Sequence, residues 1–333
     1  MSIPRWPVSL GCILAIVLSA VPAAAEGPAQ LSASRVIELK LTGRPEKAPV
    51  ISAVALDPAG KLLATGGDDH VVRIWDAGAG EVLHRLEGHA DWVRAAAFSP
   101  DGRTLATGAD DGQVWLWSAA TGQALGTLSP QTRTISALAF SPDGRLLAAA
   151  GFDGEVFLYD LASARWARTL QAPSQDVRSL SFSPDGRLLA AAGRSGVIRL
   201  WETASGKLAQ DLPGDGRRVG ALAFSPDGKT LAAGGEGRAV ALWDPASGTL
   251  AQTLPEQRAG VASLVYCGPG RLAVGGTDNR IRVWNTAARE EESILVGHTG
   301  TVSTLVWDSQ AGSLVSGGFD TAVREWSLEE RSK

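Results

Sequence analysis

The chain has 333 residues, enough for two domains of ordinary size, and carries 31 Lys and Arg against 35 Asp and Glu, for a formal net charge of −4. This mildly acidic balance excludes the strongly basic surface expected of a nucleic-acid-binding protein. With two cysteines, Cys12 and Cys267, a framework of several disulfides is also excluded.

The first 25 residues have the pattern of a secretory leader. Arg5 precedes an apolar stretch at residues 8–21 that is short for a membrane span, and small residues follow at 22–25 (PAAA). We predict a Sec-type signal peptide, cleavage after Ala25, and export to the periplasm or out of the cell, with an uncleaved anchor as the alternative. Cleavage removes Arg5 and Cys12, which leaves 30 basic against 35 acidic residues, a lone Cys267 and no transmembrane span in the mature chain.

A repeat of about 42 residues follows a short predicted linker at residues 26–33. The letters SPDGRLLAAAG stand at residues 141–151 and again at 183–193, and looser copies begin at residues 57, 99, 225, 267 and 307. Each copy leads into an apolar run that ends on an aromatic residue. These aromatics, at steps of 42, 42, 42, 42, 41 and 42, are Trp75, Trp117, Tyr159, Trp201, Trp243, Trp284 and Trp326. Seven units therefore fill residues 34–328 as one domain, and residues 329–333 remain as a tail.

One unit, residues 88–128, indicates the elements to expect. Its apolar runs at residues 92–98, 104–108, 113–117 and 123–128 are separated by turn residues. Pro100 presets the backbone of the first turn and Gly102 ends it, as in a tight hairpin. The unit is thus predicted to be a four-stranded antiparallel meander. Its small-residue second strand suits a sheet covered on both faces, so we expect the units to stack radially into a closed ring.

This repeat resembles the WD40 family. The closing Trp-Asp pair is literal at residues 75–76 and 243–244, and variants of it end the other units. The resemblance implies an all-β fold, a single seven-bladed WD40 β-propeller. Too few residues follow Trp326 to supply a fourth strand, and residues 35–41 resemble residues 81–86. An N-terminal strand at about residues 35–41 is therefore expected to join the last blade and close the ring, which removes exposed sheet edges.

Two sets of residues each combine an imidazole, a hydroxyl, a carboxylate and an indole. They are His89, Thr107, Asp111 and Trp117 in the second unit, and His298, Ser316, Asp320 and Trp326 in the seventh. By resemblance these are the hydrogen-bonded structural tetrads of the family. The alternative is a hydrolase triad, but a hydrolase needs one exposed nucleophile beside an oxyanion hole, whereas this set recurs at repeat spacing. We predict no catalytic residue. Blades four and five lack even the carboxylate, with Ser195 and Gly237 in its place, and we expect them to be less rigid.

The family resemblance also implies a docking end of the ring, formed by the loops before each first strand and between each second and third strand. Trp and Arg, the residue types enriched at interface hot spots, stand out there. The candidate partner-binding residues are Asp91, Trp92, Arg94, Phe152, Asp176, Arg178, Arg217, Arg218, Arg258 and Phe319. In the alternative interpretation, Trp92 packs across a neighbouring loop and the arginines are merely solvated.

The preferred function is a non-catalytic scaffold for protein–protein interaction, monomeric, without cofactor or metal, that binds one or more proteins and no nucleic acid. A calcium-dependent propeller hydrolase of the lactonase type is the alternative. The seven expected innermost strands contain no Asp, Glu, Asn or His to point into the channel, which lowers this alternative, although loop carboxylates such as Asp176 stay available. A small-ligand sensor at the channel mouth is a third possibility.

Overall fold

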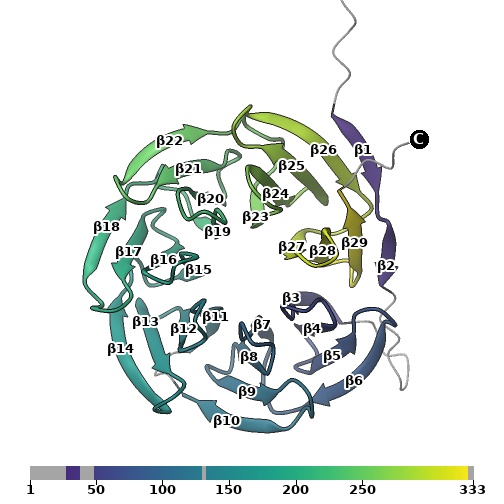
Figure 1. Ribbon diagram of the computed structural model, residues 1–333, viewed down its shortest axis with the longest axis vertical. Helices are drawn as coiled ribbons and strands as arrows, with labels where there is room; N and C mark the ends of the chain where they lie inside the picture. The colour runs from purple at the N-terminus through teal and green to yellow at the C-terminus, as the bar shows by residue number, and fades with distance from the viewer. Residues whose placement is uncertain (1–27, 38–48, 130–132, 329–333) are drawn as a thin grey trace, which may run out of the picture.

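The structure, a computed structural model, describes residues 28–37, 49–129 and 133–328, and its elements in these ranges are all β-strands. The described strands form seven sheets, six of four strands and one of five. They stand in a ring around a central axis, and we number them as blades one to seven (Figure 1). The prediction of an all-β, seven-bladed propeller is confirmed. The predicted signal peptide and C-terminal tail lie outside the described residues, and within these residues no helix long and apolar enough to cross a membrane is found.

The blades follow one another along the chain. Blade one contains β3 (Ile51–Leu56), β4 (Leu62–Gly67), β5 (Val72–Asp76) and β6 (Glu81–Leu86). Blade two contains β7 (Val93–Phe98), β8 (Thr104–Ala109), β9 (Val114–Ser118) and β10 (Ala124–Leu128), and blade three β11 (Ile135–Phe140), β12 (Leu146–Gly151), β13 (Glu155–Asp160) and β14 (Arg165–Gln171). Blade four contains β15 (Val177–Phe182), β16 (Leu188–Gly193), β17 (Ile198–Glu202) and β18 (Leu208–Leu212).

Blade five contains β19 (Val219–Phe224), β20 (Leu231–Gly235), β21 (Ala241–Asp244) and β22 (Thr249–Thr253). Blade six contains β23 (Val261–Tyr266), β24 (Arg271–Gly276), β25 (Arg280–Asn285), β26 (Glu290–Val296) and an added strand, β1 (Ala29–Ser32). Blade seven contains β27 (Val302–Asp308), β28 (Ser313–Gly318), β29 (Val323–Ser327) and β2 (Arg35–Ile37). In Figure 1 the first strand of each blade faces the central axis and the last forms the rim.

The repeated Ser-Pro-Asp-Gly text forms the turn between the first and second strands. In blade two, Ser99 Oγ donates to Asp101 Oδ1 at 2.6 Å and accepts from Thr104 N at 2.9 Å, while Gly102 takes a φ of 70° that favours glycine. These turns also touch along the ring, since a Cβ added at Gly144 would lie 3.7 Å from Pro100 Cδ of the preceding blade. The motif recurs because each turn both connects two strands and contacts the equivalent turn of the adjacent blade.

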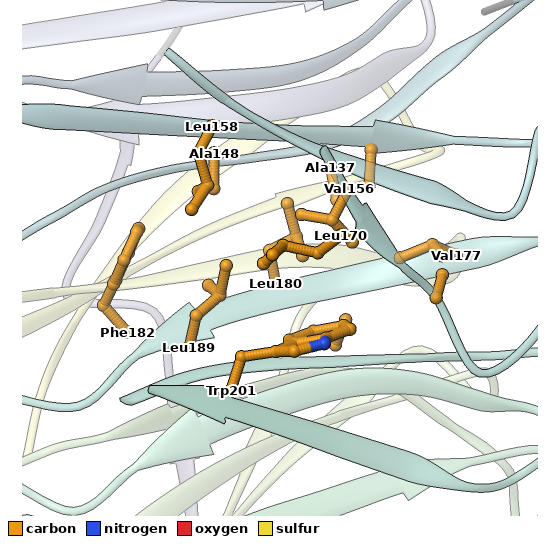
Figure 2. Close-up of a cluster of buried hydrophobic side chains, with 13 residues drawn as sticks. Ala137, Ala148, Val156, Leu158, Leu170, Val177, Leu180, Phe182, Leu189 and Trp201 are labelled. Carbon is orange, nitrogen blue, oxygen red and sulfur yellow. The ribbon is translucent and has the colours of Figure 1, made fainter. Parts of the chain in front are cut away.

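The hydrophobic core lies between blades. Figure 2 shows the cluster between blades three and four, where Val156, Leu158 and Leu170 meet Leu189 and Trp201. Equivalent clusters join the other neighbouring blades, including blades seven and one. Because one blade buries its faces only against two others, the repeat has to complete a ring to be stable.

The ring closes through the N-terminal segment, as predicted. β2 pairs antiparallel with β29, with Arg35 opposite Glu325 and Ile37 opposite Val323. The described closing strand ends at Ile37, and residues 38–41 of the predicted strand lie outside the described residues. A second closure lies near the axis, where Ser303 Oγ of blade seven donates to Ile51 O of blade one at 3.0 Å.

The assignment of residues 26–33 to a linker is wrong for residues 29–32. These residues form β1, which pairs in parallel with β26, from Ala29 opposite Ser293 to Ser32 opposite Val296. Leu31 and Ala33 pack on the cluster between blades six and seven. β1 and β2 together therefore span the joint between these two blades.

Candidate functional site

The loops singled out by the sequence lie at one end of the ring, which we call the upper face. It carries the segments before the first strand of each blade and the turns between the second and third strands. Backbone hydrogen bonds join the two kinds of loop, from Asp110 N to Trp92 O in blade two at 3.0 Å and from Arg194 N to Asp176 O in blade four at 2.9 Å. The Ser-Pro-Asp-Gly turns form the opposite face.

A β-bulge interrupts the pairing of the first two strands in every blade, at the second residue of the first strand. A bulge leaves one residue unpaired and changes the direction of its side chain. The seven bulge residues are Ser52, Arg94, Ser136, Arg178, Gly220, Ala262 and Ser303. Ser52, Ser136 and Ser303 each donate to a carbonyl of the next blade. Arg94 and Arg178 are the charged members, so blades two and four present a guanidinium where the others carry a small side chain.

In blade two the bulge arginine belongs to the Arg94 cluster, formed by Ser52, Trp92, Arg94 and Asp110. The Arg94 guanidinium lies 3.9 Å from the centre of the Trp92 ring and donates to Asp110 Oδ2 through Nη2 at 2.6 Å and Nε at 2.9 Å. Trp92 Nε1 donates to Ser52 Oγ of blade one at 2.8 Å. Trp92 is therefore hydrogen-bonded to the first strand of the neighbouring blade, and its ring also contacts the Arg94 guanidinium.

Blades three to five share the Arg178 cluster, formed by Phe152, Asp176, Arg178, Arg218 and Glu236. The Arg178 guanidinium lies 4.4 Å from the Phe152 ring centre, and its Nε is 2.5 Å from Asp176 Oδ1. Asp176 Oδ2 is 3.7 Å from Arg218 Nη2, and Arg218 Nη1 is 3.5 Å from Glu236 Oε1. The result is a continuous chain of contacts over three blades, with about a third of both arginine side chains exposed.

The remaining candidates stand apart from these clusters. Asp91 is exposed and accepts a hydrogen bond from Trp92 N, and Arg217 lies 3.9 Å from Asp215 with both side chains largely exposed. Phe319 is 47% exposed on blade seven, and Arg258 is exposed and makes no ion pair with a described residue.

Asp110 and Glu236 were missed by the sequence analysis, although they occupy the same repeat position as Phe152 and Phe319. A comparison of all seven residues at that position would have found them.

The structure brings each tetrad together. In blade two, Trp117 Nε1 donates to Thr107 Oγ1 at 2.9 Å, Thr107 Oγ1 lies 2.9 Å from His89 Nε2, and His89 Nδ1 lies 2.9 Å from Asp111 Oδ2. Blade seven repeats this with Trp326, Ser316, His298 and Asp320 at 2.8–2.9 Å, and Arg324 also donates to Asp320.

The environment of the tetrads matches a structural role. Burial lowers the pKa of His89 and of His298, against the opposing hydrogen bonds to Asp111 and Asp320, so both imidazoles are neutral near pH 7. Burial raises the pKa of Asp320, but hydrogen bonds from Thr299 and His298 outweigh it and hold that pKa below its usual range. Thr107 and Ser316 have no exposed surface, so a substrate cannot reach either hydroxyl.

Carboxylates and imidazoles are not gathered into a metal site in the part of the chain that the structure describes. No group of three or more His, Cys, Asp or Glu there could hold a metal ion. The innermost strands carry one carboxylate, Asp308 at the end of β27, and it accepts from Gln310 N and Ala311 N in its own turn. The lactonase-type alternative therefore has no described ligand set to support it.

Comparisons with known proteins agree with this architecture. Residues 50–222, just over half of the chain, match the family model of the IFT122 first beta-propeller. Residues 206–244, 248–285 and 289–327 match the model of the WD domain, G-beta repeat.

Two curated proteins resemble shorter stretches. The probable serine/threonine-protein kinase PkwA of Thermomonospora curvata is 55% identical over 42 residues, which are 13% of this chain and 6% of that protein. The cilia- and flagella-associated protein 57 of Mus musculus is 46% identical over 50 residues, 15% of this chain and 4% of that protein. Each likeness covers about one repeat and a small part of the relative, whereas the family models extend over all seven blades. From its seven stacked meanders and these matches, the chain belongs to the WD40-repeat β-propeller family.

Proposed function

We propose that this propeller is a non-catalytic scaffold that binds a partner protein on its upper face, through the Arg94 and Arg178 clusters. The observation that carries the proposal is the placement of arginine at the bulges of blades two and four, each stacked on an aromatic ring. Side chains held in this way lose little conformational freedom when a partner binds. Arg and Trp are also the residue types most enriched at interface hot spots.

The contacting segment of the partner is proposed to be acidic. The upper-face loops of blades four to six carry further exposed arginines, among them Arg194, Arg217 and Arg258. Arg258 makes no ion pair with a described residue, and Arg217 is held by Asp215 only at 3.9 Å between exposed groups. Such groups steer an oppositely charged partner and set its orientation more than they add affinity.

The scaffold is further proposed to act outside the cytoplasm, on the basis of the leader pattern at residues 1–25. The mass of the chain purified from its own host tests this directly. A chain that begins at Glu26 supports export with cleavage after Ala25, and an intact N-terminus in the cytoplasmic fraction contradicts it.

Charge reversal tests the docking face. The pair Arg94→Glu and Arg178→Glu is compared with the control pair Arg145→Glu and Arg187→Glu, which places the same chemistry on highly exposed side chains of the opposite face. Because a glutamate beside Asp176 adds repulsion, the pair Arg94→Gln and Arg178→Gln is measured as well. Thermal unfolding confirms that each variant is folded before partner capture from host extract.

The proposal predicts a specific partner that the wild type and the control pair retain and that both upper-face pairs lose. Equal capture by all variants would place the interface elsewhere. The absence of any specific partner of the wild type would argue against the scaffold itself.

A further inference from the structure

Blade five has lost most of its tetrad. Three repeats after His89, Thr107 and Asp111 stand Asp215, Ala233 and Gly237, and only the indole of Trp243 remains. In blade two the imidazole and carboxylate fill this space, with side-chain exposures of 1% and 9%. In blade five the Asp215 side chain is 61% exposed and accepts from Arg217 N, so it does not replace the imidazole.

The space between blades four and five is consequently a cavity of about 340 Å³. Apolar walls come from Ile198 of blade four and from Val219, Ala241 and Trp243 of blade five. The pairing of the second and third strands is also shorter here, with three residue pairs in blade five against five in blade two. In blade five the loss of the tetrad therefore coincides with a shorter pairing of these two strands.

The charged part of the lining consists of two arginines and one carboxylate, Asp215, and is cationic on balance. Arg217 and Arg218 both line the cavity. The Nη atoms of Arg218 are engaged by Asp176 and Glu236, but its Nε is buried and has no hydrogen-bond partner among the described residues. A buried donor without an acceptor is rare in native proteins, so this Nε is a candidate donor for an added acceptor. An anionic oxygen is the acceptor that a guanidinium binds best.

We propose that this cavity binds a small carboxylic acid with an apolar body. The carboxylate accepts from Arg218 and Arg217, and the apolar body lies against Trp243 and the aliphatic walls. A volume near 340 Å³ is at the lower end of the range of ligand pockets, about 300–1,000 Å³, so the ligand is a single ring or a short chain. The same chemistry occurs in a free acid and in the C-terminal residue of a peptide. The site does not depend on the docking function, since blades four and five alone supply its lining.

The probes are phenylacetate with its neutral isostere phenylacetamide, and N-acetyl-Gly-Gly-Phe with a free or an amidated C-terminus. Binding to the purified full chain is measured by saturation-transfer NMR and titration calorimetry. We expect a carboxylate probe to bind with a Kd of about 1 mM or tighter, and its amide to bind at least about tenfold more weakly. Tighter binding by phenylacetate indicates a free acid as the source, and tighter binding by the peptide acid indicates a protein C-terminus.

Blade two shows which residues would restore the tetrad of blade five. The substitutions Asp215→His, Ala233→Thr and Gly237→Asp restore the tetrad of blade two and fill the cavity. A Cβ at Gly237 meets no backbone, since the nearest atom is Asp215 Oδ2 at 3.3 Å and that side chain is replaced. We expect this variant to have a higher Tm and at least tenfold weaker probe binding, so that the loss cannot be attributed to unfolding. Arg218→Gln is expected to weaken binding to a similar extent, and the opposite-face variant Arg187→Gln to leave it unchanged. Binding that is equal in the restored variant, equal for acid and amide, or absent for every probe would overturn the proposal.

Discussion

The tetrad of blade seven offers the sharpest test of a structural role. Ser316 has no exposed surface, and its Oγ accepts from Trp326 Nε1 and lies 2.8 Å from His298 Nε2. Ser316→Ala leaves the indole N–H and the imidazole without this partner, and neither group reaches water, since Trp326 and the His298 side chain are each 1% exposed. An unpaired buried polar group costs about 1–3 kcal/mol, so two of them should lower the free energy of unfolding by at least about 2 kcal/mol.

Urea unfolding, followed by tryptophan fluorescence and by hydrogen exchange of the peptides of blade seven, measures this loss. The control is Ser309→Ala, which makes the same substitution in the exposed turn between β27 and β28 and should change stability by less than about 0.5 kcal/mol. A loss in Ser316→Ala no larger than that of the control would refute the structural interpretation of the tetrads.

Variation of pH, truncation of the N-terminus and labelling of Cys267 test three other features of the ring. Burial holds the pKa of His89 and His298 below 6.5, so the imidazoles bind protons more readily in the unfolded chain. The free energy of unfolding should therefore be constant above about pH 7 and fall as the pH decreases below 6.5. A rise in the urea midpoint as the pH is lowered from 7 to 5.5 would contradict this. A chain that begins at residue 33 lacks β1 alone, whereas one that begins at residue 42 also lacks β2 and leaves β29 as an open edge. Only the second chain should aggregate, as measured by light scattering. Equal behaviour of the two chains would argue against closure by β2. Burial raises the pKa of the Cys267 thiol to about 12. Peptide mass spectrometry should therefore find Cys267 unlabelled by iodoacetamide at pH 8 in the folded protein and labelled in urea. Rapid labelling of the native chain would show that the joint between blades six and seven opens.

The sequence predicted the fold well because the seven blades of a propeller share one sequence pattern. The Ser-Pro-Asp-Gly turn, the small second strand and the closing aromatic each recur at a constant step, and each has a local physical meaning that one repeat is enough to interpret. The closing strand was also predictable, since residues 35–41 resemble residues 81–86, which form an outer strand of blade one.

Contacts between blades were harder to predict from the sequence. β1 has four residues, AQLS, whose parallel pairing with β26 leaves little pattern in the letters. The docking candidates were found by their unusual residue types, but the bulges that direct Arg94 and Arg178, and the acidic partners Asp110 and Glu236, depend on which residues face each other across a sheet or a joint. The sequence showed Gly237 in place of the carboxylate of blade five, but it did not show the cavity, because one wall comes from Ile198 of the neighbouring blade.

Site-specific cross-linking in the native host tests whether the upper face is the docking surface. A photoreactive phenylalanine analogue replaces Phe152, the exposed ring beneath Arg178, in one variant and the opposite-face Arg187 in another. If it is, position 152 yields a discrete cross-linked product with the partner captured by the wild type, and position 187 yields none. A product from position 187 alone would contradict it and place the docking surface on the opposite face of the ring.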